Sequence, residues 1–157
     1  MQLSLHSDYA LRVLMALAAC DRRLSVDDIA RRYAISRNHL AKVAQRLQAE
    51  GLVETFRGRG GGMHLARPAD EIVIGDVVRR FENLDSFVGC FVAGAGCAVG
   101  GVCALKPALA GALDAFLAHL DGYRLSDLVP DPGAFAERLE WAVRIENLAG
   151  GAAADLR

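Results

Sequence analysis

The chain has 157 residues, of which 53% are hydrophobic and 24% are charged. This length suits one or two small domains with a hydrophobic core, and the composition excludes a chain that is disordered throughout. Residues 1–69 hold 11 Lys and Arg against 6 Asp and Glu (+5), while residues 70–157 hold 7 against 13 (-6), which together give the net charge of -1. Such an asymmetry is typical of a basic part that contacts DNA joined to a part that does not.

The location of the protein is predicted from its apolar runs and its cysteines. The first apolar run, Ala10–Ala19, is interrupted by Arg12, lacks a basic leader and is shorter than the roughly 20 residues of a membrane span. We therefore expect a cytoplasmic protein with no membrane partner. In that reducing compartment the four cysteines are expected to be metal ligands, redox groups or buried side chains rather than disulfides.

Apolar spacing predicts three helices in the first part of the chain. The first covers Asp8–Ala19, and the other two follow after short turns. The third ends at Gly51, where a left-handed residue stops it. A helix, a short turn and a second helix form the arrangement of a helix-turn-helix DNA-binding unit. The predicted N-caps are, in chain order, Ser7 or Asp8, then Ser25, then Ser36, and the buried stripe of the third helix is Leu40, Val43, Ala44 and Leu47.

Two strands are predicted after these helices, over Leu52–Phe56 and Met63–Ala66, with a basic, glycine-rich tip between them. A phosphate-binding glycine loop is the alternative, but such a loop lies between a buried strand and a helix, and here Pro68 follows the second strand. The hairpin is therefore interpreted as the wing of a winged helix-turn-helix. A fourth helix is predicted from the spacing of Ile74, Val77, Val78 and Phe81.

Polar and basic side chains gather on the predicted recognition helix and on the wing. Asn and Gln can pair with adenine, and Arg and Lys can pair with guanine or with phosphate. A solvated polar face on an ordinary helical domain is the alternative, but the caps, the turn, the wing and the basic charge agree with DNA binding. The predicted DNA-binding residues are Ser36, Arg37, Asn38, His39, Lys42, Gln45, Arg57 and Arg59.

Residues 84–103 lose helical periodicity and hold five glycines together with Cys90, Cys97 and Cys103. A loop of this length inside a small protein is usually functional or disordered. Pro107 then suits the first turn of a long helix. The apolar stripe of that helix needs a partner surface, and because a second copy of the chain is the simplest one, a homodimer is predicted. The stripe consists of Leu109, Leu113, Phe116, Leu117 and Leu120.

The spacing of the three loop cysteines favours an iron–sulfur cluster. Structural zinc normally uses Cys-x2-4-Cys pairs, whereas Cys90-x6-Cys97-x5-Cys103 contains none. A cluster tolerates wider spacing because its thiolates must reach different corners of a larger object. The remaining cysteine, Cys20, falls on the apolar side of the first helix and is predicted to belong to the core. A zinc site, or three cysteines without a metal role, is the alternative.

Five segments within residues 1–130 carry a resemblance to a known family: SDYALRVLMALA, SRNHLAKVAQRLQAEGLV, RGRGGGMHLARP, IGDVVRRFE, and the run from Cys103 through DGYRLSDLV. They resemble the IscR/NsrR/RirA family of bacterial winged-helix iron–sulfur regulators. Within that family they are most similar to the nitric-oxide-sensing NsrR repressors, above all in SRNH, in the glycine wing and in IGDVVR.

The resemblance implies a homodimer in which Cys90, Cys97 and Cys103 hold each cluster. In NsrR-type proteins an aspartate near the N-terminus of the other subunit can complete the ligands of a 4Fe-4S cluster, and this would be Asp8 of the partner subunit. The alternative role for Asp8 is only that of a helix cap. IscR-type proteins instead use a histidine three residues after the last cysteine, where this sequence has Lys106. The resemblance therefore favours a 4Fe-4S over a 2Fe-2S cluster.

The predicted fold is mainly α and falls into four parts. Residues 1–82 are expected to form the winged helix-turn-helix with its two-stranded wing, and residues 83–104 the cysteine-bearing cluster loop. Residues 105–129 are expected to form the dimerisation helix region. Residues 130–157 are expected to hold a last amphipathic helix, Phe135–Leu148, and a disordered tail.

The predicted function is that of a repressor that binds double-stranded promoter DNA while its cluster is loaded. Nitric oxide is the expected signal, and nitrosylation or loss of the cluster would release the DNA. A regulator of the same family that senses iron or cluster supply is the alternative. A cysteine-centred redox protein or electron carrier is a more distant one. No enzyme is predicted, because the four histidines are scattered along the chain and no catalytic pairing follows from their spacing.

Overall fold

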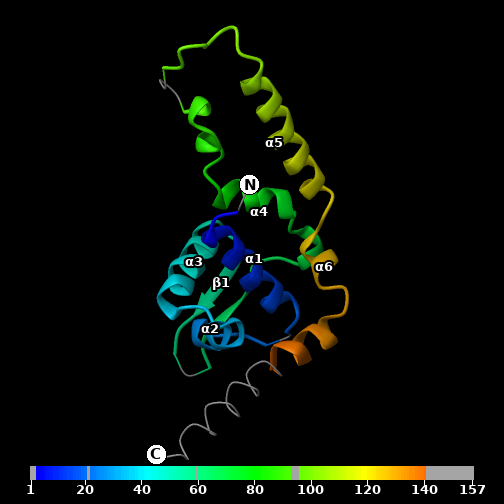
Figure 1. Ribbon diagram of the computed structural model, residues 1–157. Helices are drawn as coiled ribbons and strands as arrows, with labels where there is room; N and C mark the ends of the chain where they lie inside the picture. The colour runs from blue at the N-terminus through cyan, green and yellow to red at the C-terminus, as the bar shows by residue number, and fades with distance from the viewer. Residues whose placement is uncertain (1–2, 21, 59, 93–95, 141–157) are drawn as a thin grey trace, which may run out of the picture.

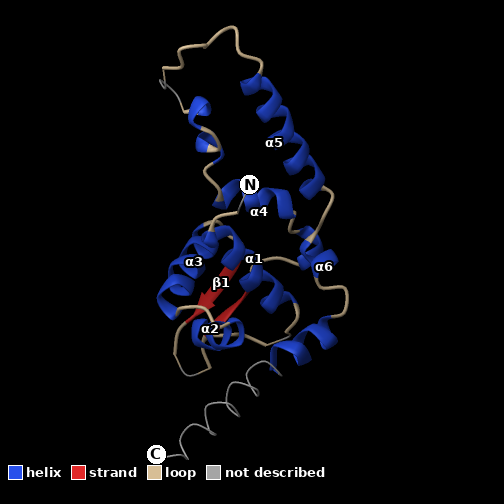
Figure 2. Ribbon diagram, viewed as in Figure 1, coloured by secondary structure: helices blue, strands red, loops and turns tan. Residues whose placement is uncertain are grey.

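The computed structural model describes residues 3–20, 22–58, 60–92 and 96–140, and these are mainly helical, as predicted (Figure 2). A layer of helices packs on one small antiparallel sheet, and one long helix extends away from it (Figure 1). The elements in chain order are α1 (Leu5–Ala18), α2 (Val26–Tyr33), α3 (Arg37–Ala49), β1 (Val53–Phe56), β2 (Gly62–Leu65), η1 (Ala69–Glu71), α4 (Ile74–Phe81), η2 (Leu84–Ser86), η3 (Gly89–Phe91), α5 (Leu105–Asp121) and α6 (Leu125–Leu128).

Helix α1 begins three residues earlier than predicted, so the predicted caps Ser7 and Asp8 are wrong. The N-cap is Ser4, whose extended backbone lets its hydroxyl oxygen accept a hydrogen bond from the Ser7 amide at 3.2 Å. Ser7 is fully buried and its hydroxyl lies 3.2 Å from that of Ser4, while Asp8 lies in the first helical turn. Serine and aspartate can both cap a helix, and the position of Ser4 before the first turn made it the cap.

The helix-turn-helix is formed by α2 and α3. Ser25 and Asp28 make a capping box: the Asp28 amide donates to the Ser25 hydroxyl at 3.0 Å, and the Ser25 amide donates to the Asp28 carboxylate at 3.1 Å. Ala34 has φ of 52° and turns the chain into α3. Ser36 occupies the N-cap of α3 as predicted, but its side chain makes no capping hydrogen bond to the described residues. The four predicted stripe residues of α3 are all buried.

The wing is the predicted two-stranded antiparallel sheet, with Val53 opposite Leu65 and Phe56 opposite Gly62. The strands lie within one residue of the predicted bounds. Two hydrogen bonds join the wing to the loop before α2, because the Leu24 amide donates to the Met63 carbonyl at 3.1 Å and the reverse bond measures 2.8 Å. The wing is therefore fastened to the helix-turn-helix rather than attached only at its ends.

Helix α4 contributes to two hydrophobic clusters. Ile74, Val77 and Phe81 belong to the main core with residues of α1 and α3, whereas Val78 packs with Leu113 and Leu117 of α5. All four predicted α4 positions are buried. Each fully buried aliphatic side chain stabilises the fold by about 1.5–3 kcal/mol. Helix α4 therefore packs against the DNA-binding unit on one side and against α5 on the other.

Side chains join the C-terminal end of α5 to α4. Arg79 pairs with both carboxylate oxygens of Asp121 at 2.5 and 2.7 Å. Beside this pair, Gly75 leaves room for the Asp121 carboxylate, since a Cβ there would lie 1.9 Å from its oxygen. Of the predicted α5 stripe only Leu113 and Leu117 are buried. The others are partly exposed because α5 projects beyond α4 (Figure 1).

The segment after α6 folds back onto α1 and α2 (Figure 1). Residues 132–140 are helical, earlier than the predicted start at Phe135, and Leu139 is buried in the main core. The nearly buried Arg32 of α2 pairs with Glu140, which also accepts from Arg22 at 3.2 Å. The hydrogen bond from Arg32 holds the pKa of Glu140 below its ordinary value. The rest of the predicted helix and the tail, residues 141–157, lie outside the described residues.

Substituting Val78 and Val77 separately should test the two-sided packing of α4. Each valine-to-alanine change is expected to lower the free energy of unfolding by about 1–3 kcal/mol, because both side chains are buried. Val78→Ala should increase amide hydrogen exchange mainly in α5, and Val77→Ala mainly in α1 and α3. The same exchange pattern in both variants would contradict the assignment of these neighbours to different clusters.

The contact between Glu140 and Arg32 should make the docking of this C-terminal segment pH-dependent. The pKa of Glu140 is lowered on folding, so its ionised form stabilises the folded state. This contribution to the free energy of unfolding is fully present above the ordinary glutamate pKa and is lost as the pH falls through the lowered pKa. Urea unfolding should therefore show Glu140→Gln less stable than the wild type at pH 7, with the difference disappearing in acid. Glu137→Gln on the same helix is the matched control and should show no such trend.

Candidate functional site

The predicted recognition face is intact and accessible. Leu40 and Val43 turn into the core, and the opposite side of α3 faces solvent. All six predicted DNA-binding residues on this part of the chain are exposed, namely Ser36, Arg37, Asn38, His39, Lys42 and Gln45. The first turn of α3 therefore presents donors and acceptors of the kinds that read base edges.

One of these side chains is held by a neighbouring helix. The Nε atom of Arg37 lies 2.5 Å from a carboxylate oxygen of Asp27, which belongs to the first turn of α2. Asp27 was not among the sequence-predicted site residues. The predicted N-cap at Ser25 identified this turn, but the approach of Asp27 to Arg37 depends on the angle between the two helices.

An arginine that was not among the predicted site residues lies against the wing. Arg57 is exposed at the end of β1 as predicted, and Arg59 lies outside the described residues. Arg23, from the loop before α2, places its guanidinium 3.7 Å from the centre of the Phe56 ring, and that ring stacks on His64 at 5.1 Å. The adjacent residues Arg22 and Arg23 form a local positive charge that could have been recognised in the sequence. Its position on the wing follows from the hydrogen bonds between Leu24 and Met63.

Basic side chains at the other end of α3 connect it to α4. The Arg46 guanidinium lies 4.8 Å from the centre of the Phe81 ring and donates to the backbone carbonyl of Arg80. Arg80 in turn donates to the carbonyl of Glu50 at 3.0 Å. These contacts tie the C-terminal end of the recognition helix to the helix that also packs on α5.

The three loop cysteines lie between α4 and α5, at the end of the molecule away from the wing (Figure 1). Cys90 belongs to η3 and is half-buried, Cys97 is exposed, and Cys103 is half-buried two residues before α5. Within the described ranges, no three His, Cys, Asp or Glu side chains are close enough together to hold a metal ion. The three free thiols are nevertheless the soft donors that iron–sulfur clusters use, so the chemistry of the donor set fits such a group.

The other two residues considered for this site are placed differently. Asp8 is on the surface of α1, where its carboxylate pairs with Arg12 at 2.9 Å. Cys20 lies two residues beyond the end of α1 and is half-buried against the main core, in agreement with its predicted packing role. Asp8 is therefore accessible to a second molecule, whereas Cys20 packs against the main core.

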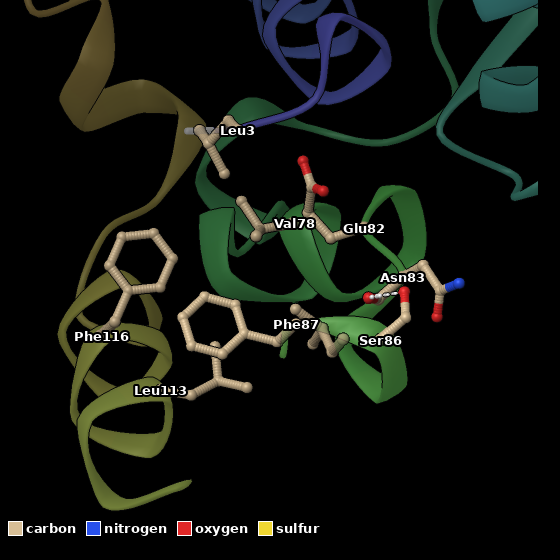
Figure 3. Close-up of a pocket in the computed structure, with 9 residues that line it drawn as sticks. Leu3, Val78, Glu82, Asn83, Ser86, Phe87, Leu113 and Phe116 are labelled. Carbon is tan, nitrogen blue, oxygen red and sulfur yellow. Dashed lines mark hydrogen bonds between the residues drawn. The ribbon is translucent and has the colours of Figure 1, made fainter. Parts of the chain in front are cut away.

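A cavity of about 330 Å³ lies beneath the start of the cysteine loop. Figure 3 shows Val78 of α4 and Leu113 and Phe116 of α5 lining it, with Phe87 of the loop projecting inward and Leu3 above. Glu82 lies at its rim and accepts from the Ser4 amide at 2.7 Å. Partial burial raises the pKa of Glu82, but hydrogen bonds from Ser7 and Ser4 outweigh it and hold the pKa below its ordinary value. The loop thus packs directly on both α4 and α5.

No helix among the described residues is both long and apolar enough to cross a lipid bilayer.

The fold is shared with solved regulators. The structure of CymR, the global cysteine regulator of B. subtilis, matches with a TM-score of 0.67 and 27% identity, covering 83% of this chain and 97% of that one. The structure of T. potens IscR matches with a TM-score of 0.65 and 26% identity, covering 83% of this chain and 88% of that one.

Curated relatives and a family match agree with the structural similarity. The chain is 46% identical to the HTH-type transcriptional regulator NsrR of Geobacillus kaustophilus, over 89% of this chain and 97% of the relative. It is 48% identical to the NsrR of Bacillus subtilis, over 82% and 90%. Residues 3–131 match the Rrf2 family, described as an iron-dependent transcriptional regulator. With its winged helix and exposed recognition face, the chain belongs to the Rrf2 family of DNA-binding transcriptional regulators.

Proposed function

We propose that this regulator is a homodimeric, nitric-oxide-responsive repressor that binds promoter DNA while it carries an iron–sulfur cluster. The observation that carries the proposal is the position of three free thiols on the loop that joins α4 to α5. The iron-dependent description of the family and the similarity to NsrR proteins support it. A 4Fe-4S cluster is favoured over 2Fe-2S.

Cys90, Cys97 and Cys103 are the proposed protein ligands, and Asp8 of the partner subunit is the proposed fourth. Asp8 is partly exposed, with 40% of its side chain accessible, and among the described residues it pairs only with Arg12, which leaves it accessible to another chain. When bound, the cluster supplies iron that can react with nitric oxide. An oxygen ligand from a second subunit makes the integrity of the site depend on the dimer.

The contacts of α4 give the cysteine loop a physical connection to the recognition helix. The loop packs on Val78 and Leu113 through Phe87. The other side of α4 reaches α3, where Arg46 lies over Phe81. A rearrangement of the loop therefore acts on a helix that supports the DNA-reading surface, which is the two-state element that the proposed switch needs.

The first test compares DNA binding by the anaerobically prepared cluster-loaded protein before and after nitric oxide. We expect affinity for its promoter DNA to fall by about tenfold or more, within the usual range of coupling between two sites, together with the loss of iron–sulfur absorbance. Cys97→Ala is the control and should lack the absorbance and bind weakly under both conditions. Unchanged affinity of the loaded protein after nitric oxide would contradict this signal.

A regulator that senses iron or cluster supply is the second candidate, and the family description favours it. It predicts weak binding by the cluster-free protein but no response of the loaded protein to nitric oxide. The same experiment with chelator-treated protein separates the two candidates. The redox-carrier alternative gains no support from relatives that are transcriptional regulators.

Arg57 on the wing should contribute to DNA affinity through its charge alone. Arg57 is exposed beside the glycine-rich tip, so we expect it to contact phosphate rather than a base. Arg57→Gln should weaken binding to all sequences similarly and should reduce the slope of log affinity against log salt by about 1. Lys106→Gln removes a charge at the start of α5, far from the wing (Figure 1), and should leave that slope unchanged. A change confined to one operator base would contradict the phosphate role.

A further inference from the structure

The pair formed by Arg37 and Asp27 joins the first turns of the two helices of the helix-turn-helix. Asp27 is the second residue of α2, and Arg37 is the first residue of α3. Only the Nε atom of Arg37 contacts the Asp27 carboxylate, at 2.5 Å. Within the described part of the chain, the two terminal nitrogens of this guanidinium donate no hydrogen bond.

The position of Asp27 is set by a rigid turn. The capping box of Ser25 and Asp28 holds the backbone amides on either side of it through two hydrogen bonds. The positive end of the α2 dipole favours a carboxylate at this place. Asp28 is occupied by Ser25 and by Arg31 at 2.8 Å, so it does not compete for Arg37.

Stability of the fold gives little reason for this pair. The side chains of Arg37 and Asp27 are 66% and 59% exposed. A pair as exposed as this contributes about 0–1 kcal/mol, because water and salt screen it. A negative charge beside a DNA-binding surface also opposes the approach of phosphates. The effect of the pair is therefore sought in the geometry of Arg37 and not in the stability of the fold.

A guanidinium held through Nε presents its two terminal nitrogens side by side, away from the carboxylate. That end-on pair of donors matches the two acceptors, O6 and N7, that guanine displays in the major groove. Arginine has a fixed planar fork, so fixing one side of the plane also orients the other. The first turn of a recognition helix is the part that reaches base edges.

We propose that Asp27 is a positioning residue for base reading, which holds Arg37 so that its terminal nitrogens bind a guanine. The proposal rests on the DNA-binding function and adds to it a specified base. Each half-site of the operator then contains one guanine whose recognition requires both Arg37 and Asp27. Asp27 itself touches Arg37 and acts through it.

Selection of binding sites from a random-sequence duplex pool tests this, because the pool contains every short operator sequence. The full-length, cluster-loaded dimer is compared with Asp27→Ala, Asp27→Asn, Arg37→Gln and the double variant Asp27→Ala/Arg37→Gln. We expect one guanine position in the selected half-site to lose its preference by about 5- to 150-fold in Arg37→Gln, which corresponds to one bidentate base contact. Asp27→Ala should relax the same position and leave the other positions and the salt dependence unchanged.

Two further comparisons make the result decisive. The double variant should be no less selective at that position than Arg37→Gln alone, because Asp27 acts only through Arg37. Asp76→Asn removes a carboxylate of equal exposure, 59%, that lies 3.6 Å from Arg79 on α4, and should leave the selected sequence unchanged.

Three results would overturn the proposal. The guanine preference could survive in Asp27→Ala and Asp27→Asn, which would show that Arg37 does not depend on its partner. Arg37→Gln could weaken binding to all sequences equally with a shallower salt slope, which would make it a phosphate contact. A wild-type protein that selects no sequence at all would remove sequence-specific DNA binding, and the base-reading role with it.

Discussion

Helix α4 has to satisfy two hydrophobic surfaces at once, and the arrangement of the whole molecule depends on this constraint. Adjacent valines point in different directions, with Val77 in the main core and Val78 against α5. A helix with apolar residues on both sides has no position that buries them except between two partners. The winged helix-turn-helix and the long helix are those partners, so neither can shift without disturbing α4.

The constraint gives the proposed cluster site on the cysteine loop a physical connection to the recognition helix, which is more than one element away. The loop leaves α4 through η2 and enters α5, and its Phe87 packs in the cluster formed by Val78 and Leu113. On the far side, the contacts of Arg46 with α4 hold the end of α3. Packed interiors respond to a change at one side by moving between discrete arrangements rather than by deforming gradually. The cysteine loop is therefore connected to α3 by a short series of direct contacts through α4.

The DNA-reading surface is organised by pairs that contribute little to stability. Arg37 pairs with Asp27, and Arg23 lies over the Phe56 ring of the wing. Exposed ion pairs and cation–π contacts are individually weak. In the proposed mode of DNA binding, these contacts reduce the number of orientations of long basic side chains, so that less conformational entropy is lost on binding. By contrast, the nearly buried Arg32 with Glu140 anchors the segment after α6 to α2 and belongs to the support of this surface.

Local features of the sequence determined the helices, the turn, the wing, the capping box at Ser25 and the exposed recognition face, because periodicity, caps and glycines act over a few neighbouring residues. They also indicated which side chains are candidates for binding metal and DNA. Only the tertiary structure decided that Ser4 caps α1, that Asp27 meets Arg37, and that Arg23 lies on the wing. These outcomes depend on which neighbours are buried and on the angles between separate elements. Such quantities arise from packing over the whole molecule and leave no local pattern in the chain.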